Sequence, residues 1–144
     1  MKTLLTVLAT LALGSFASAK EGWIDNLQAA KAQAQKENKK ILLDFTGSDW
    51  CGWCKKLDAE VFSQQAFKDY AAKHLVLVEV DFPHGHQLAA ETKKQNDALA
   101  AKYHIEGFPT IIVLSAGGTK QGELGYTPGG PSAFIKELEH PGHR

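Results

Sequence analysis

The sequence predicts an α/β fold in which a central mixed β-sheet is flanked by helices on both faces. The first observation behind this prediction is that short, branched apolar runs alternate with longer segments of helical periodicity. Along the chain the predicted order is helix, strand, helix, strand, helix, strand, strand, helix. The second observation is Gly117-Gly118, a turn that joins the last two predicted strands as a hairpin.

The first 19 residues have the pattern of a secretory signal peptide. Lys2 forms a short basic region, residues 4–13 form an apolar core, and Ala17-Ser18-Ala19 fits a cleavage site. A membrane anchor is the alternative, but this core is much shorter than the roughly 20 residues that a spanning helix needs. We therefore expect an exported protein, periplasmic or secreted, in a compartment where a cysteine pair can persist as a disulfide.

Residues 20–144 are predicted to form one domain. In the whole chain 16 basic residues balance 16 acidic ones, and 44% of the residues are hydrophobic, enough for an ordinary core. No concentration of one charge sign points to a nucleic acid or a membrane surface as a partner. We expect a monomer that binds no nucleic acid.

The N-terminal half is predicted to contain three helical stretches and two strands. Apolar residues at helical spacing predict a helix over residues 23–38. Residues 41–45 are too few for a helix and rich in branched side chains, so they are predicted as a buried strand. Helices follow over residues 51–60 and residues 63–74, the second capped by its first residue. Residues 75–81 mix apolar and acidic side chains and are predicted as the second strand.

The C-terminal half is predicted to begin with a loop over residues 82–86 and a helix over residues 87–103. Strands over residues 110–114 and residues 120–126 lie on either side of the glycine turn. Residues 131–139 are predicted as a closing helix, because a proline suits its first turn.

The two cysteines of the chain, Cys51 and Cys54, are separated by two residues and lie directly behind a predicted strand, where a helix is expected to begin. A helix start offers unpaired N–H groups and the positive end of the helix dipole, and both favour a thiolate. The thiolate is the nucleophile in thiol–disulfide exchange. Because Cys54 lies one turn further and is expected to be more shielded, Cys51 is predicted to attack and Cys54 to resolve.

Three other readings of the cysteine pair remain. A structural disulfide is one, although so small a loop restrains the unfolded chain little. Half of a zinc site is another, for which His84 and His86 are the compact candidates for the missing ligands. Two inert thiols are the third. We expect no metal and no cofactor.

Asp44 is an anomaly, because a carboxylate inside an apolar strand is costly unless it is paired or functional. Asp44-Phe45, the segment WCGWCK at residues 50–55 and the segment YHIEGFPT at residues 103–110 together resemble the thioredoxin family. The resemblance covers essentially all of residues 20–144, and the exported form resembles bacterial thiol–disulfide oxidoreductases of the cell envelope.

The resemblance implies a thioredoxin-like fold and an enzyme that exchanges disulfides with client proteins through Cys51 and Cys54. It also implies a redox partner that recycles the enzyme, with a membrane-embedded protein as one option. Whether the enzyme acts as reductant, oxidant or isomerase is left open. A non-catalytic thioredoxin-like binding module is the alternative function.

The resemblance also implies roles for individual residues. Pro109 matches a cis-proline that faces the cysteines, and the backbone of Phe108 matches a segment that pairs with the client. Asp44 matches a buried acid that helps to move the proton of the resolving thiol, and burial is expected to raise its pKa toward neutrality. Trp50 and Trp53 are candidates for a client platform, with core packing as the equal alternative for Trp50.

Three features depart from the thioredoxin pattern. Gly52-Trp53 stands where thioredoxins have Gly-Pro, and the segment between Asp44 and Cys51 is one residue longer. Glu79 stands where thioredoxin has a lysine beside the buried acid. Glu79 is expected either to approach Asp44, so that two carboxylates titrate as a coupled pair, or to lie on a solvated face.

Overall fold

A computed structural model describes residues 20–142, so the predicted signal peptide lies outside the described residues and stays a prediction. The sheet has five strands in the spatial order β1-β3-β2-β4-β5. The strands are β1 (Trp23–Ile24), β2 (Lys40–Thr46), β3 (Leu75–Asp81), β4 (Thr110–Leu114) and β5 (Lys120–Leu124). β1 and β2 run parallel to β3, whereas β4 runs antiparallel to β2 and to β5, so the sheet is mixed, as predicted.

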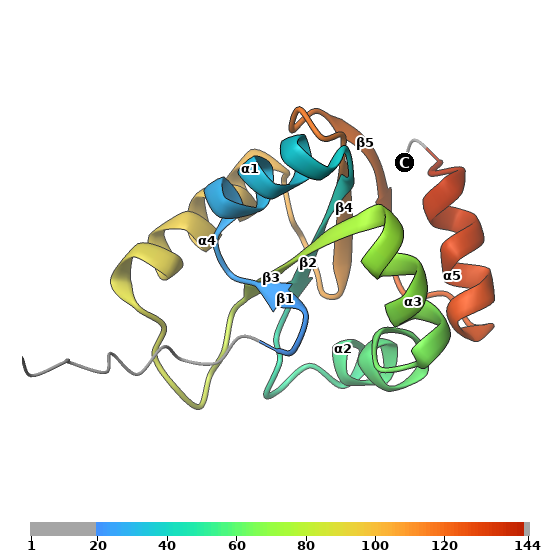
Figure 1. Ribbon diagram of the computed structural model, residues 1–144. Helices are drawn as coiled ribbons and strands as arrows, with labels where there is room; N and C mark the ends of the chain where they lie inside the picture. Colours follow the sequence, from blue (N-terminus) through green and yellow to red (C-terminus); the bar gives the residue numbers. More distant parts are fainter. Residues whose placement is uncertain (1–19, 143–144) are drawn as a thin grey trace, which may run out of the picture.

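Helices cover both faces of the sheet (Figure 1). They are α1 (Leu27–Glu37), α2 (Gly52–Leu57), the π-helical η1 (Asp58–Phe62), α3 (Gln65–His74), α4 (Ala90–Lys102) and α5 (Gly130–Glu139). One buried cluster joins the sheet to α2, η1, α3 and α5, and a second joins it to α1 and α4. The predicted fold class is confirmed.

The central strand β2 divides its side chains between these two layers. Leu42 belongs to the cluster under α2 and α3, whereas Leu43 and Phe45 belong to the cluster under α1 and α4. Because side chains alternate along a strand, Asp44 shares the face of Leu42. The strand therefore directs Asp44 toward the layer that contains α2.

The start of the chain differs from the prediction of a helix over residues 23–38. Trp23 and Ile24 instead pair with Leu77 and Val78 of β3 and form an edge strand. The helix begins only at Leu27, because the Asn26 side chain accepts a hydrogen bond from Ala29 N at 2.9 Å and caps it.

Other boundaries shift by a few residues. The helix predicted over residues 51–60 begins at Gly52 and continues as a π-helix to Phe62. Ser63 was predicted to cap the next helix, but its hydroxyl donates to Ala59 O at 3.1 Å, and Gln64 occupies the cap position. The helix predicted from residue 87 begins at Ala90, and β5 ends at Leu124 rather than at residue 126. Within residues 20–142, no helix is both long and apolar enough to cross a bilayer.

Candidate active site

Cys51 and Cys54 form a disulfide at the start of α2, after the short loop that follows β2. Cys51 is the N-cap of α2, and its Sγ accepts a hydrogen bond from Cys54 N at 3.3 Å. The Cα atoms are 5.3 Å apart, a normal separation for a disulfide. The two residues are 7% and 6% exposed, so the expected difference in shielding is absent in this oxidised state. What distinguishes Cys51 is its place at the helix start.

Two tryptophans flank this disulfide and are the large hydrophobic side chains exposed among the described residues: Trp50 is 41% exposed and Trp53 57% exposed. The exposure of Trp50 argues against the core-packing alternative. Its indole stacks on His84 with ring centroids 4.5 Å apart, and a Cβ at Gly47 would collide with it. Trp53 packs against Tyr126 at 5.2 Å.

The loop that enters β4 lies beside the cysteine loop. Its Phe108–Pro109 peptide bond is cis, and both residues are half-buried. The Phe108 ring meets the Trp50 ring edge-on at 5.8 Å. Because β4 pairs with β2, with Thr110 opposite Phe45, the loop is held at the end of β2 from which the cysteines follow.

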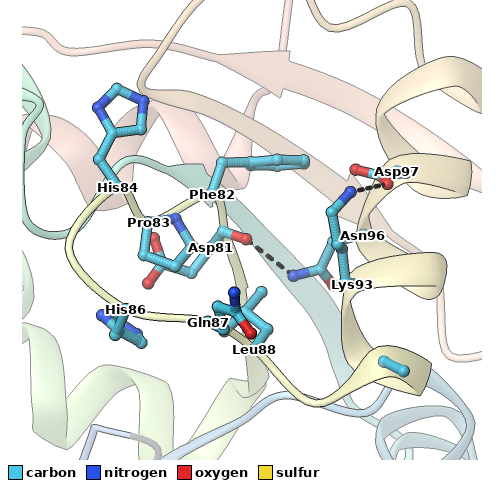
Figure 2. Close-up of a pocket in the computed structure, with 11 residues that line it drawn as sticks. Asp81, Phe82, Pro83, His84, His86, Gln87, Leu88, Lys93, Asn96 and Asp97 are labelled. Carbon is cyan, nitrogen blue, oxygen red and sulfur yellow. Dashed lines mark hydrogen bonds and ion pairs between the residues drawn. The ribbon is translucent and has the colours of Figure 1, made fainter.

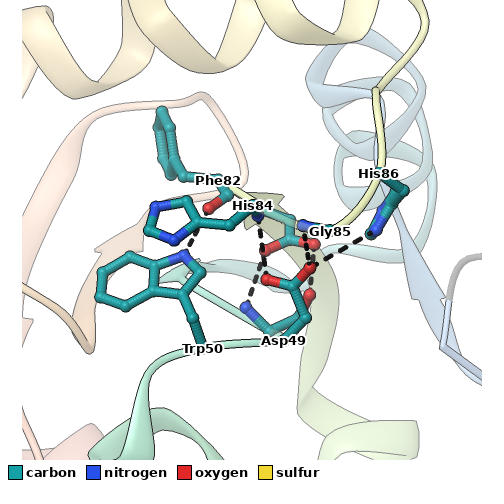
Figure 3. A network of polar contacts seen from close by, with 8 residues as sticks. Asp49, Trp50, Phe82, His84, Gly85 and His86 are labelled. Carbon is teal, nitrogen blue, oxygen red and sulfur yellow. Dashed lines mark hydrogen bonds and ion pairs between the residues drawn. The ribbon is translucent and has the colours of Figure 1, made fainter.

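Hydrogen bonds tie the cysteine loop to residues 82–86 (Figure 3). The Asp49 carboxylate accepts from His84 N at 3.0 Å and from Gly85 N at 2.6 Å, and these bonds lower its pKa. Ser48 donates from its N and Oγ to the Asp81 carboxylate at 2.9 and 2.5 Å. Trp50 Nε1 donates to the carbonyl of Phe82 at 2.7 Å. Three consecutive residues before Cys51 are thus hydrogen-bonded to the end of β3 and the loop that follows it.

The same loop also lines a pocket together with α4 (Figure 2). It has a volume of about 780 Å³ between residues 81–88 and the first turns of α4. Asn96 Nδ2 donates to Asp81 O at 3.0 Å, and Lys93 pairs with Asp97 at 2.5 Å along its wall. Neither cysteine lines it. This pocket is therefore separate from the disulfide.

Asp44 lies in a smaller pocket of about 170 Å³ behind Cys54. Asp44 is 7% exposed, and burial raises its pKa to about 7; Glu79 and Asp81 push the pKa in the same direction, whereas Lys20 opposes them. The Oδ1 atom of Asp44 has no hydrogen-bond partner among the described residues. Because Asp44 and Cys54 line the same pocket, the longer segment before Cys51 does not separate them.

Glu79 approaches Asp44 rather than lying on a solvated face. The two residues are directly opposite each other in the parallel pairing of β2 with β3, and both line the small pocket. Glu79 is only partly exposed, and burial, followed by the charge of Asp81, raises its pKa. The charge of Glu79 therefore helps to raise the pKa of Asp44, which follows the first of the two alternatives given for Glu79.

Within residues 20–142, no group of three or more His, Cys, Asp and Glu side chains is arranged to hold a metal ion. His86 lies with Nδ1 3.7 Å from the Asp49 carboxylate, and His84 stacks on Trp50. The histidines considered for a zinc site thus have other contacts.

A family model described as a thioredoxin-like domain matches residues 27–140. The chain belongs to the thioredoxin-like family. The predicted resemblance is thereby confirmed, and it extends over most of the chain.

Relatives of this thioredoxin-like chain are proteins named for disulfide chemistry. It is 36% identical over 110 residues to the disulfide bond reductase DsbH of Chlamydia pneumoniae, covering 76% of this chain and 66% of DsbH. It is 30% identical over 121 residues to the thioredoxin-related protein DsbJ of the same organism, covering 80% of this chain and 35% of DsbJ. The chain thus spans less than two thirds of the length of either relative.

A solved structure of a DsbH oxidoreductase superposes with a TM-score of 0.78 at 32% identity, covering 96% of this chain and 93% of the solved one. The oxidised C-terminal domain of DsbD from Neisseria meningitidis shares the fold, with a TM-score of 0.57 at 24% identity over 81% of this chain. This thioredoxin-like chain is therefore homologous to disulfide oxidoreductases and carries its own paired Cys-X-X-Cys motif.

Sequence reasoning placed the cysteines, Asp44 and both tryptophans in this thioredoxin-like site, but it missed the groups that surround them. Asp49 and Asp81, which hold the cysteine loop, were not identified, because the groups that donate to them lie 33 to 36 residues away along the chain and no local pattern marks such a contact. Lys20 was seen only as the residue that follows the predicted cleavage site.

Proposed function

We propose that this protein is a thiol–disulfide oxidoreductase that exchanges disulfides with client proteins through Cys51 and Cys54. The observation that carries the proposal is the Cys51–Cys54 disulfide at the N-cap of α2, between two exposed tryptophans. Homology to a protein named a disulfide bond reductase supports the same activity and favours the reducing direction.

In the reducing direction, the Cys51 thiolate attacks one sulfur of a client disulfide. A Cys51–client disulfide forms, and the other client sulfur leaves as a thiolate. Cys54 then attacks the Cys51 sulfur, so that the Cys51–Cys54 disulfide forms and the second client sulfur leaves. Two electrons pass to the client, and its two thiolates take up the two protons that the cysteine thiols release. The same steps in reverse oxidise a client.

Asp44 is proposed to accept the proton of the Cys54 thiol before the second step. Its place in the pocket behind Cys54 and the pKa of about 7 that burial gives it support this role. A base whose pKa lies near the working pH exchanges protons most effectively. The pocket is also large enough to hold the water that a relay between the two groups would need.

The client is proposed to bind across Trp50, Trp53 and the Phe108–Pro109 loop. Exposed aromatic side chains offer apolar contact area that needs little ordering, and the backbone of Phe108 lies at the start of β4 beside the cysteine loop. The partners are then proteins with thiols or disulfides and a recycling redox protein, for which a membrane-embedded protein is one option.

We place the protein, as a monomer, in the periplasm or outside the cell.

Trapping of mixed disulfides tests the division of labour between the cysteines. Cys54→Ser should accumulate covalent client adducts that a reductant releases, because the resolving step is lost. Cys51→Ser should accumulate almost none, and it serves as the matched control. Adducts formed through Cys54 instead would contradict the assigned roles.

An insulin-reduction assay separates the enzyme from a binding-only module. The wild-type protein should accelerate reduction, whereas both serine variants should not. A wild-type protein that binds clients but neither reduces insulin nor forms adducts would support the non-catalytic alternative.

A further inference from the structure

The pocket behind Cys54 holds two carboxylates that need a nearby cation. Asp44 and Glu79 lie opposite each other on neighbouring strands and point to the same face of the sheet. Asp81 of β3 adds a further negative charge that acts on both of them. Like charges in a buried site disfavour ionisation of each other, so a carboxylate here ionises readily only if a positive charge faces it.

Lys20, three residues before β1, brings such a charge to this pocket. Its Nζ forms an ion pair with the Asp58 carboxylate at the start of η1. The same Nζ lies 4.7 Å from the centre of the Trp23 ring and 5.1 Å from that of Phe62. The carbonyl of Lys20 accepts a hydrogen bond from Trp23 N at 2.8 Å, so its backbone is also fixed to the edge strand.

The position of Lys20 is unlike that of an ordinary surface lysine. Its side chain is 32% exposed, and burial lowers its pKa, while the charges of Asp44 and Glu79 raise it. The charged and titratable groups that line the pocket with Lys20 or act on it are Asp44 of β2, Glu79 of β3, Cys54 and Lys55 of α2, Asp58 of η1 and Lys68 of α3. Asp81 of β3 acts on the two carboxylates Asp44 and Glu79. The charge of Lys20 lowers the pKa of Asp44 and also that of Glu79.

We propose that Lys20 is a positioning residue for the proton transfer, because its ammonium, held over the pocket by Asp58, favours the charged form of the Asp44 carboxyl behind Cys54. This inference rests on the proposed function, in which Asp44 accepts the Cys54 proton. Lys20 itself touches neither sulfur in this arrangement. It acts by keeping Asp44 ready to accept a proton at neutral pH.

The direct test follows the Asp44 carboxyl carbon by NMR over a pH titration of the oxidised protein, in which no thiol titrates. Lys20→Met should raise the pKa of Asp44 by about one unit, since Lys20 lowers this pKa and the loss of a neighbouring opposite charge shifts a carboxyl by about that much. Lys20→Arg keeps the charge and should keep the pKa close to that of the wild type. Lys120→Met removes an exposed lysine that pairs with Glu123 on β5, and it should leave the titration unchanged.

A kinetic arm separates this inference from the proposed function. The rate at which the reduced protein closes its disulfide is measured with oxidised glutathione between pH 5 and 9. Lys20→Met should move the pH dependence of closure upward by about one unit, and it should cause no further shift in an Asp44→Asn background. Intact mass checks that every variant begins at the same residue, because residue 20 follows the predicted cleavage site.

The outcomes are distinct. If Asp44→Asn leaves the pH dependence of closure unchanged, the proton role of Asp44 fails, whatever Lys20 does. If Asp44→Asn alters it but Lys20→Met shifts neither the titration nor the closure rate, Asp44 keeps its role and the inference about Lys20 is overturned. Equal shifts for Lys20→Met and Lys20→Arg would also overturn it, because charge would then not be the cause.

Discussion

Replacing Asp44 with asparagine should stabilise the oxidised protein at neutral and alkaline pH relative to acidic pH. Burial raises the pKa of Asp44 from its ordinary value of 3.8 to about 7. The folded protein therefore holds a proton over a pH range in which the unfolded chain has released it. The free energy of unfolding falls as pH rises through that range, and asparagine, which does not titrate, removes the loss.

The structure sets the size of the effect. The difference between a pKa of 3.8 and one of about 7 corresponds to about 4 kcal/mol, because each pKa unit is worth about 1.4 kcal/mol. This loss in the free energy of unfolding is absent below about pH 4 and complete above about pH 7. Between pH 5 and pH 8 the titration of Asp44 lowers the free energy of unfolding by about 2.5 kcal/mol. The site is almost fully buried, so solvent screens this charge little.

Urea denaturation of the oxidised form at several pH values between 5 and 8 measures the effect. The difference in unfolding free energy between Asp44→Asn and the wild type should move by about 2.5 kcal/mol in favour of the variant from pH 5 to pH 8. Asp69→Asn, at an exposed position of α3, is the matched control. Its free energy of unfolding should change with pH in the same way as that of the wild type. A difference that stays constant with pH would refute the reasoning, because Asp44 would then not carry a raised pKa.

Two further predictions concern the surface around the disulfide. Trp53→Ala should raise KM several-fold for a protein client but leave the rate with oxidised glutathione nearly unchanged, because a small disulfide does not need the exposed indole; equal losses with both substrates would contradict a role in client binding. Asp49→Ala should speed hydrogen exchange at the amides of His84 and Gly85 by about tenfold, because both donate to this carboxylate. Unchanged exchange at these two amides, measured against Asp69→Ala, would show that other contacts hold the loop.

Local patterns along the chain were enough to predict several elements and one unusual residue. The bounds of β3 and β4 were predicted to the residue, because runs of branched apolar side chains between turn signals identify a buried strand. The start of a helix at the cysteine pair followed from the same reasoning, since Cys51 comes shortly after an apolar strand. The position of Asp44 in that strand also marked it as unusual before its surroundings were visible.

Contacts between segments that lie far apart in the sequence could not be predicted and became visible only in the folded chain. Trp23 and Ile24 form a strand because β3, more than 50 residues later, offers an open edge, and local helical spacing could not reveal this. The fastening of Asp49 to Gly85 crosses 36 residues, and the ion pair of Lys20 with Asp58 crosses 38. Burial of Asp44, and with it a pKa near 7, exists only once β2, β3 and α2 enclose one pocket. Periodicity describes how one segment presents its faces, whereas the charge environment of a buried group is set by whichever segments pack around it.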